Sequence, residues 1–586
     1  MASSLQVEAL RFAYPPVRSE EPSQWVLDGV DVALGAGEWL AVMGASDAGK
    51  TTLCLFASGL APSLTGGTQE GHVCVAGRDT GEYPPPALAA EVGLVFQDPT
   101  SQLFNPTVET EVAWGLENLA LPLPIMRARL GQALSRFGIE ALRHRSPLTL
   151  SGGEKKRLAL ASVLAMQPSV LVLDEPMGGL DPAGREQVLA ALSGLLREQS
   201  VTVLMTESDP EAVAAFASRL AILSGGRLTI DDTPRSALSQ GERLAAAGVA
   251  VPQMAQLAAA LNLRTGSAFD FLTVDEAQRA LVPWLKREPA PGRSASQSEG
   301  GPPLSQPAGA RDAAVELQGL WHWYEEERRP VLRGIDLLVG AGELVALVGA
   351  NGSGKTTLVK HMNGLLRPRR GRVRILGEDS AGRTIGEMAR SVGFLFQNPE
   401  QQIFSATVQD EIAFGPRNLK LSPAEAARRV GDAIERFALA GVAHQPPAIL
   451  SYGLRRRLTL ASLAAMDPPI LVLDEPSVGL DAAGRDDLVR WLREKQEAGR
   501  TIVLVTHDMA LAAECAGRMV VLRNGEVVAD GTPAQLFWQP ELLHSASLAP
   551  PPIVALAEAL RPYGLHCRCL GVDALCQELA ILTGRA

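Results

Sequence analysis

The chain has 586 residues, 46% of them hydrophobic, and a formal net charge of −11, which is typical of a globular protein of several domains, about four by size alone. The acidic balance argues against a nucleic-acid partner, because nucleic acids bind basic surfaces. Residues 1–10 lack the pattern of a signal peptide, and no uninterrupted apolar run reaches about 18 residues. We therefore expect a cytosolic chain with no membrane span, so that any membrane role comes through a partner.

The first motif along the chain is GASDAGKTT at residues 44–52, which fits G-x-x-x-x-G-K-[ST]. In such a loop, backbone N–H groups turn onto nucleotide phosphates, the lysine reaches the β and γ phosphates, and the next hydroxyl ligates Mg²⁺. The candidate ATP contacts are Gly44, Gly49, Lys50, Thr51 and Thr52, with Thr51 as the Mg²⁺ ligand.

Two further motifs follow in the first half. LSGGE at residues 150–154 opens a helix predicted over residues 154–166, and a serine beside flexible glycines at a helix start forms an anion cradle. Its candidate contacts are Ser151, Gly152, Gly153 and Glu154. VLVLDEP at residues 170–176 predicts a buried strand that ends in two carboxylates, Asp174 and Glu175. Two short amphipathic helices, over residues 251–261 and 271–281, close this half.

The chain contains two copies of one sequence unit. Gln97, Leu150 and Asp174 recur as Gln397, Leu450 and Asp474, each 300 positions later, so the chain is a tandem duplication of a domain-sized unit. Residues 287–313, rich in Pro, Gly and Ser, predict a flexible linker. The expected domains are a first catalytic domain (1–240), its C-terminal appendix (241–286), the linker (287–313), a second catalytic domain (314–540) and a second appendix (541–586).

The second half repeats the pattern. Residues 344–348 predict a buried strand that leads into GANGSGKTT, and the helix that begins near Gly354 points its N-terminal dipole at the phosphates. Short strands are predicted over residues 393–396, 470–473 and 501–505, a helix over 423–437, and appendix helices over 550–560 and 570–582. The pattern indicates an α/β core with an inserted helical subdomain. The candidate ATP contacts of the loop are Gly349, Asn351, Gly352, Ser353, Gly354, Lys355, Thr356 and Thr357.

The strand-end pair Asp474 and Glu475 carries the expected chemistry. Asp474 is placed to bind Mg²⁺, and Glu475 to orient and deprotonate an attacking water. Taken in order with the phosphate loops and with LSGGE or LSYGL, these motifs resemble the ATP-binding-cassette (ABC) family over nearly the whole of both halves. The resemblance implies an ATP hydrolase that uses ATP and Mg²⁺, built from two α/β P-loop ABC ATPase domains, each with a RecA-like core, an inserted helical subdomain and a small C-terminal helical appendix.

The same resemblance implies roles for other residues. Tyr14 and Tyr324 match the aromatic residue that stacks on adenine, and His507 matches the histidine that holds the γ-phosphate. Gln97 and Gln397 match the loop glutamine that senses Mg²⁺ and contacts the membrane partner. In this family two domains pack head to tail, so each ATP lies between the phosphate loop of one domain and the signature of the other.

Four differences between the two copies bear on the expected chemistry. Asp47 stands where the second copy has Gly352, and Glu207 stands where it has His507. In the signature the second copy has Tyr452 and Leu454, and we match these two residues to Gly153 and Glu154 of the first copy, or to near equivalents.

Head-to-tail packing would put all four departures in one composite site, which joins the first phosphate loop to Ser451 of the second signature. The other composite site would join the intact LSGGE to the catalytic set of the second half, which is Lys355, Thr356, Asp474, Glu475 and His507. We expect the first site to bind ATP but hydrolyse it slowly; the alternative is unrelated drift in each half.

Residues 96–119 and 396–419 resemble the ATPases of energy-coupling factor (ECF) importers and of cobalt and nickel importers. The resemblance implies a transmembrane coupling subunit, a small membrane subunit that captures a vitamin or metal ion, and a peripheral location on the cytoplasmic face of the membrane. Candidate groove residues are Leu103, Phe104, Ile403 and Phe404, with Glu109, Glu111, Asp410 and Glu411 available to partner arginines. Core packing is an equal alternative for the apolar residues.

Several alternatives stay open. The chain could serve a sugar importer, or act on ribosomes or DNA as a soluble ABC protein. The appendices could be capping tails or docking surfaces. Cys54, Cys74 and Cys515 read as core residues, whereas His566, Cys567, Cys569 and Cys576 form a group that either binds a metal or has no such role.

Overall fold

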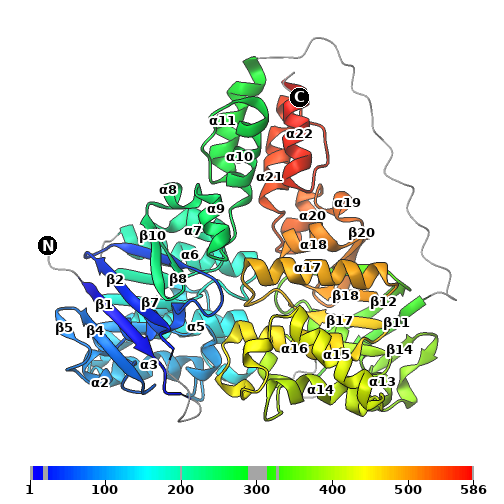
Figure 1. Ribbon diagram of the computed structural model, residues 1–586, viewed down its shortest axis with the longest axis horizontal. Coiled ribbons are helices and arrows are strands. Elements are labelled where there is room, and N and C mark those ends of the chain that lie inside the picture. Colours follow the sequence, from blue (N-terminus) through cyan, green and yellow to red (C-terminus); the bar gives the residue numbers. More distant parts are fainter. Residues whose placement is uncertain (1–3, 17–23, 198–200, 288–312, 325–328, 584–586) are drawn as a thin grey trace. The chain divides into compact units, whose positions relative to one another are not determined.

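The computed structural model describes residues 4–16, 24–197, 201–287, 313–324 and 329–583 (Figure 1). Its contacts divide the chain into two units, residues 1–255 and 256–586, which are described separately. Most of the predicted linker, residues 288–312, lies outside the described residues. No helix in the described part combines the length and the apolar character that crossing a bilayer requires.

Unit 1 contains a four-stranded antiparallel sheet of order β2-β1-β4-β5 and a six-stranded sheet of order β10-β9-β3-β8-β7-β6. Every residue of strands β3, β7 and β8 is buried. This agrees with their continuous apolar sequences, which are typical of parallel strands with both faces covered. The strands are β1 (Leu5–Ala13), β2 (Leu27–Leu34), β3 (Trp39–Met43), β4 (Thr68–Val75), β5 (Arg78–Asp79), β6 (Val92–Val95), β7 (Val170–Asp174), β8 (Thr202–Thr206), β9 (Arg219–Ser224) and β10 (Arg227–Asp232).

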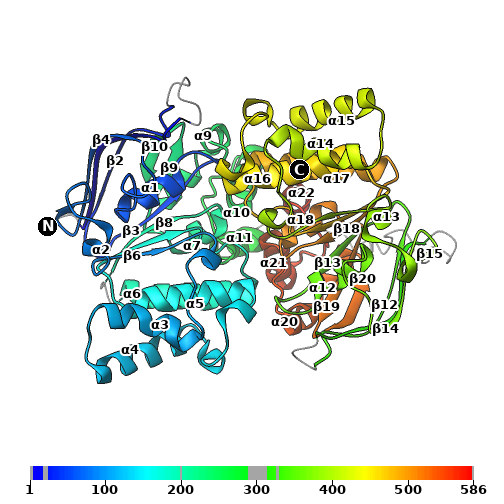
Figure 2. The same cartoon turned by 90° about the horizontal axis from the view of Figure 1, so that it is seen from below.

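Three helices of unit 1, α3, α4 and α5, pack on one another as the inserted helical subdomain (Figure 2). The helix after the second motif begins at Gly152, two residues before its predicted start, because Ser151 caps it. The helices are α1 (Lys50–Ala57), α2 (Pro85–Leu88), α3 (Val108–Asn118), α4 (Leu123–Arg136), α5 (Gly152–Ala165), α6 (Pro182–Arg197), α7 (Pro210–Phe216), α8 (Pro234–Leu238) and α9 (Gly241–Ala246).

Unit 2 repeats both sheets, with orders β12-β11-β14-β15 and β16-β17-β18-β13-β19-β20. One buried cluster lies between these two sheets, and another joins the large sheet to the helical subdomain. The strands are β11 (Ala313–His322), β12 (Leu332–Gly340), β13 (Leu344–Val348), β14 (Arg370–Ile375), β15 (Glu378–Asp379), β16 (Val392–Leu395), β17 (Ile470–Asp474), β18 (Thr501–Val505), β19 (Arg518–Arg523) and β20 (Glu526–Gly531).

The catalytic half of unit 2 has the same helical plan as unit 1, with α14, α15 and α16 as its helical subdomain. The helices are α12 (Lys355–Met362), α13 (Ile385–Met388), α14 (Val408–Asn418), α15 (Pro423–Arg436), α16 (Tyr452–Met466), α17 (Ala482–Glu497), α18 (Met509–Cys515), α19 (Pro533–Leu536) and α20 (Pro540–Ser545). Each predicted strand and helix of this half is present within two residues of its expected ends.

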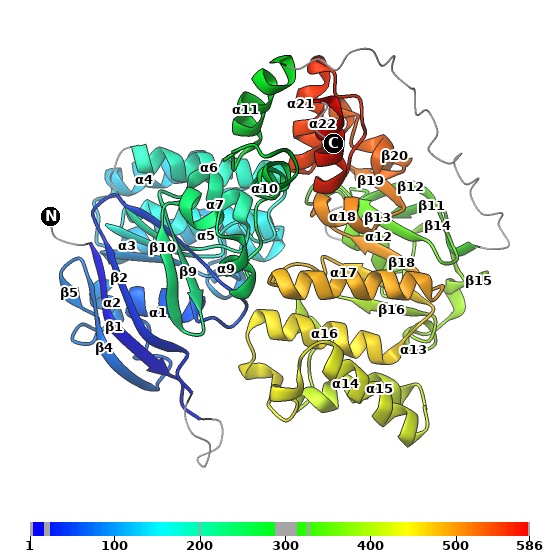
Figure 3. The ribbon, with the colours of Figure 1, turned by 45° about the horizontal axis from the view of Figure 1, so that its top comes forward.

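The two predicted appendices contribute α10 (Gln253–Thr265) with α11 (Val274–Arg287), and α21 (Pro552–Leu560) with α22 (Val572–Leu582). Helix α11 packs against α21 within unit 2 (Figure 3). The amide of Gln278 on α11 donates to the carbonyl of Ala559 at 3.4 Å. Of the two alternatives for the appendices, this contact favours docking between them over a simple capping tail.

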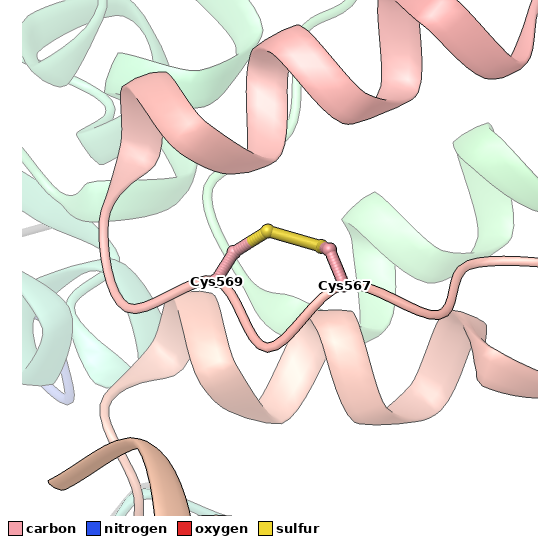
Figure 4. Close-up of a disulfide and its surroundings, with 2 residues drawn as sticks. All are labelled: Cys567 and Cys569. Carbon is pink, nitrogen blue, oxygen red and sulfur yellow. A yellow bond between two sulfur atoms is a disulfide. The ribbon is translucent and has the colours of Figure 1, made fainter. Parts of the chain in front are cut away.

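The C-terminal cysteine group holds a disulfide. Cys567 and Cys569, in the loop before α22, are bonded to each other (Figure 4), while Cys576 is a buried free thiol. Across the described residues, no group of three or more His, Cys, Asp or Glu side chains could hold a metal ion. Cys54 and Cys515 are buried as predicted, and Cys74 is half-buried on β4.

Candidate nucleotide sites

In unit 2 the motif residues meet at one edge of the large sheet. Strands β13, β16, β17 and β18 are parallel, and the carboxyl ends of parallel strands form the edge where ligands bind in such sheets. The phosphate loop follows β13, Gln397 follows β16, Glu475 follows β17 and His507 follows β18. Residues more than 100 positions apart in the sequence therefore share one site.

The second phosphate loop closes around its own lysine. Lys355 is 7% exposed, and its Nζ donates to the carbonyls of Gly349 at 2.7 Å and Ala350 at 2.9 Å. A Cβ on Gly349 would lie 2.2 Å from the Leu522 carbonyl oxygen, so only glycine fits there. Gly354 has φ +104 and caps α12, so the amide end of that helix faces the loop.

The donor set around Asp474 fits Mg²⁺. The Thr356 hydroxyl donates to Asp474 Oδ2 at 2.8 Å, while Asp474 Oδ1 is buried with no hydrogen-bond partner among the described residues. Burial raises the pKa of Asp474 to about 6, although the Thr356 hydrogen bond opposes the rise. A carboxylate with an unsatisfied oxygen beside a hydroxyl is the ligand pair expected for this hard cation.

Glu475 is paired with His507. His507 Nδ1 lies 2.8 Å from Glu475 Oε1, and the His507 backbone N–H donates to Oε2 at 3.3 Å. Burial favours the neutral carboxyl, but the charge and hydrogen bonds of His507 outweigh it, so the pKa of Glu475 is lowered. Glu475 also holds a left-handed backbone, φ +52, the kind of strain that gathers at functional sites.

Unit 1 has the same scaffold with different partners. Lys50 Nζ donates to the carbonyls of Gly44 at 2.8 Å and Ala45 at 2.9 Å. Asp47 has φ +65, the left-handed conformation that Gly352 adopts and that Asp tolerates. Gln97 Nε2 donates to Glu175 Oε2 at 3.0 Å, and burial raises the pKa of Glu175 although Lys50 opposes this.

Glu207 occupies the place of His507 as a buried acid. Its Oε1 accepts from the backbone N–H groups of Ser208 at 2.9 Å and Asp209 at 3.1 Å. Its Oε2 is buried with no hydrogen-bond partner among the described residues. Burial, together with the charges of Asp209 and Glu175, raises the pKa of Glu207 to about 7.

The two signatures differ in how they are capped. Ser151 and Glu154 form a capping box, in which the Ser151 N–H and hydroxyl both donate to Glu154 Oε2 at 2.8 Å. The Ser451 hydroxyl accepts from the Leu454 backbone N–H at 3.2 Å, and the apolar Leu454 cannot return a bond to complete a capping box. The helices begin at Gly152 and Tyr452, so Tyr452 replaces Gly152, and the match to Gly153 was wrong.

The ring of Tyr452 packs on the loop that carries the GLD sequence. A Cβ on Gly479 would lie 2.4 Å from Tyr452 Cδ1, whereas one on Gly179 would meet nothing within 4 Å. The bulk of the Tyr452 ring therefore lies against Gly479 of the same unit.

The residues beside the loop glutamines divide into two groups. Phe104 and Phe404 are 64% and 65% exposed, and each meets another aromatic ring edge to face, Trp114 at 5.0 Å and Phe414 at 4.6 Å. Leu103 is buried and Ile403 packs on the core, so for these two the core alternative holds.

Glu111 and Glu411 do not offer free carboxylates. Each is 5% exposed, and each accepts two backbone N–H bonds, from residues 104 and 105 and from residues 404 and 405. Their predicted availability to partner arginines was wrong, because both carboxylates hold the loop that presents the exposed phenylalanines. Glu109 and Asp410, in contrast, keep partly exposed side chains that pair with Arg143 and Arg417.

The tyrosines matched to the adenine contact are similar in both units. Tyr14 and Tyr324 each place the hydroxyl 3.1 Å from a threonine of the phosphate loop, Thr52 and Thr357. Tyr324 is 40% exposed. A buried histidine pair, His322 and His361, lies beside Tyr324, and the two facing ring nitrogens are 3.2 Å apart. The sequence did not lead us to predict this pair, although the signal was there: each histidine is a polar residue among apolar ones.

A protein-family model described as ABC transporter matches residues 27–178 and 332–478. A protein of Methanosarcina mazei described as an ABC transporter ATP-binding protein is 35% identical over 563 residues, which cover 96% of this chain and 94% of the relative. One of Streptomyces avermitilis with the same description is 37% identical, and the match covers 92% of this chain and 96% of the relative. Among solved structures, cbiO1 from Clostridium perfringens, part of the ABC transporter complex cbiONQ, is 32% identical, with 42% of this chain and 99% of that chain covered and a TM-score of 0.36.

The chain therefore belongs to the ABC transporter family, as a tandem of two ATP-binding ATPase domains. The predicted fold class, two α/β ABC ATPase domains, is confirmed. The predicted activity, ATP hydrolysis, is confirmed at the level of the family.

Proposed function

We propose that this chain is the fused ATPase of an ECF-type importer of a vitamin or metal ion, with one consensus and one degenerate ATP site. The proposed difference between the two ATP sites is supported by the different partners of the two strand-end glutamates. Glu475 pairs with His507, whereas Glu175 bonds to Gln97 and faces the buried acid Glu207.

In the consensus site, Lys355 and the glycine loop bind the phosphates of ATP, and Tyr324 contacts the base. Thr356, Asp474 and Gln397 hold Mg²⁺, which supplies positive charge to the phosphates when it is bound. Glu475 accepts a proton from the attacking water, and its lowered pKa keeps it ionised for that task. His507, at 2.8 Å from Glu475, orients this carboxylate and donates to the γ-phosphate.

In the degenerate site, Lys50, Thr51 and Asp174 retain the means to bind ATP and Mg²⁺. Glu207 puts an acid where the other site has a donor, and the raised pKa of Glu175 weakens it as an ionised base at low pH. We infer that this site binds ATP and turns it over slowly.

We further propose that the two ATPase domains, with the limits 1–240 and 314–540, pair head to tail. Each ATP then contacts one phosphate loop and the signature of the other domain, so the consensus loop meets Ser151, Gly152, Gly153 and Glu154. The capping box of Ser151 and Glu154 supports this choice, because it holds the signature serine at a helix start that suits an anion.

The membrane partners follow from the exposed aromatic pairs. Phe104 with Trp114 and Phe404 with Phe414 lie next to the loop glutamines in sequence, and exposed apolar clusters of this kind mark protein contacts. We propose that they receive a transmembrane coupling subunit, which also binds a small substrate-capture subunit and holds the chain at the cytoplasmic face of the membrane.

Steady-state ATPase assays of two matched variants test the asymmetry. Glu475→Gln is expected to lower kcat by about 10²–10⁴-fold, because it removes the positioned base. Glu175→Gln is expected to change kcat less than about threefold, since Glu175 belongs to the slow site, which contributes little to the total turnover. Equal losses from the two substitutions would refute the proposal.

Purification of the chain from membranes tests the importer class. The expected result is co-purification of a transmembrane coupling subunit and a small substrate-binding subunit, identified by mass spectrometry. A Phe104→Ser/Phe404→Ser variant should lose both partners while its nucleotide binding persists. Recovery of a sugar-importer permease instead would assign the chain to that class.

A further inference from the structure

A buried cation lies at the same place in each unit, at the start of the helix that carries the signature. Lys156 on α5 is 2% exposed and Arg456 on α16 is 0% exposed. Neither belongs to a predicted nucleotide contact. Burial of a charge is costly unless it is fully hydrogen-bonded, so the partners of these two side chains indicate what they do.

Lys156 joins three segments of unit 1. Its Nζ donates to the carbonyl of Gln97 at 2.8 Å and to the carbonyl of Glu175 at 2.8 Å. The signature helix, the loop glutamine and the strand-end glutamate are thereby held by one ammonium group. Burial lowers the pKa of Lys156, whereas the nearby charges of Glu175 and Asp174 oppose this.

Arg456 shares one of these contacts, the carbonyl of the loop glutamine, and its larger fork reaches two other carbonyls. It donates to the carbonyls of Phe396 at 2.8 Å and of Gln397, and its Nε donates to the carbonyl of Val478 at 3.3 Å. The Tyr452 hydroxyl lies 3.3 Å from the same guanidinium. Arg456 therefore ties the backbone of the loop glutamine to the segment after Glu475, and both to the signature helix.

We propose that Arg456, with Lys156 as its counterpart, is a positioning residue that makes the loop glutamine, the segment following the strand-end glutamate and the signature helix move as one piece. Its guanidinium bonds to backbone carbonyls, so it acts on catalysis through the backbone of Gln397 and Val478. An arginine fork reaches three carbonyls in fixed geometry, whereas a lysine reaches two as a point charge. The inference rests on the proposed function, since it takes Glu475 as the base of the faster site.

The test compares Arg456→Met, Arg456→Lys and Lys156→Met in the full-length chain. Arg456→Met is expected to lower kcat by about 10²-fold, the size of effect that misplacing a reacting group by about 1 Å produces. The dissociation constant for ATP should stay within about threefold, because no nucleotide contact is lost. Arg456→Lys should recover kcat to within about fivefold of wild type, because in unit 1 a lysine at this place holds the carbonyl of Gln97, the counterpart of Gln397. Lys156→Met should lower kcat less than Arg456→Met does, because the carbonyls that Lys156 holds, those of Gln97 and Glu175, belong to the slow site.

Three results would overturn the proposal: an unchanged kcat in Arg456→Met, a loss of kcat matched by an equal loss of ATP affinity, or no recovery in Arg456→Lys. A purely structural role would reduce the folded fraction and leave kcat per folded molecule unchanged. If Arg456→Met yields no folded protein, Arg456→Gln takes its place under the same criteria. Glu475→Gln is measured alongside: if that variant stays active, the proposed function fails, whereas an inactive Glu475→Gln beside a fully active Arg456→Met refutes the positioning role alone.

Discussion

Replacing Glu207 by glutamine isolates the contribution of one buried acid to the site that we propose is degenerate. The folded-state pKa of Glu207 is about 7, against an ordinary value of 4.5. Because the folded protein binds this proton more tightly than the unfolded chain, stability falls as the pH rises from 4.5 to 7 and the whole cost persists above 7. The difference corresponds to about 3 kcal/mol. Glutamine keeps an oxygen for the N–H groups of Ser208 and Asp209 and carries no charge.

The same titration controls ATP binding if the phosphates require the neutral form of Glu207. With a pKa of about 7, the competent fraction is about 0.9 at pH 6 and about 0.1 at pH 8, so the apparent dissociation constant rises about tenfold between them. The assay is fluorescent-ATP titration of a chain whose second site is disabled by Lys355→Ala. Glu207→Gln in that background should bind with nearly equal affinity at both pH values.

The matched comparison removes the ionisation of the nucleotide and of Glu175, which are common to both chains. Unfolding at pH 8 supplies the second measurement, in which Glu207→Gln should stabilise unit 1 by up to about 3 kcal/mol. Affinity of the parent chain that is flat from pH 6 to pH 8, or an equally steep dependence in Glu207→Gln, would refute the reasoning.

Two further predictions concern stability. Burial lowers the pKa of His361 to about 4 from 6.5, so the folded protein binds this proton less tightly than the unfolded chain. Stability is therefore lost as the pH falls below 6.5, and the loss reaches about 2 kcal/mol at pH 5. His322→Phe/His361→Phe, which copies the aromatic pair of unit 1, should narrow the gap between unfolding midpoints at pH 7.5 and pH 5; an unchanged gap would contradict this. Glu154→Leu, which copies Leu454, should cost unit 1 about 1 kcal/mol in urea denaturation, because Ser151 loses its capping partner.

The sequence predicted the strands of the catalytic core well because each is a short, wholly apolar run that no helix period explains. Residues 344–348 and 501–505 were expected as strands and form β13 and β18 with those bounds. The start of α5 was placed late, because capping by Ser151 leaves two further residues helical.

Side-chain partners could not be read in this way. Glu111 and Glu411 sit in polar stretches and looked available, yet the fold buries them against backbone N–H groups. Nor does the sequence show that the ring of Tyr452 rests on Gly479.

The sequence by itself determined the class of protein, the duplication and the identity of the motif residues, because phosphate binding restricts residue types at fixed spacing along one loop and one strand end. Only the tertiary structure decided which partner each of those residues has. Glu175 and Glu475 occupy identical motifs, but one bonds to a glutamine and the other to a histidine. In both units the strand that ends at this glutamate lies between the strand that precedes the loop glutamine and the strand that precedes Glu207 or His507. The replacement of His507 by Glu207 therefore changes the partner of the glutamate through the order of the strands and not through spacing along the chain.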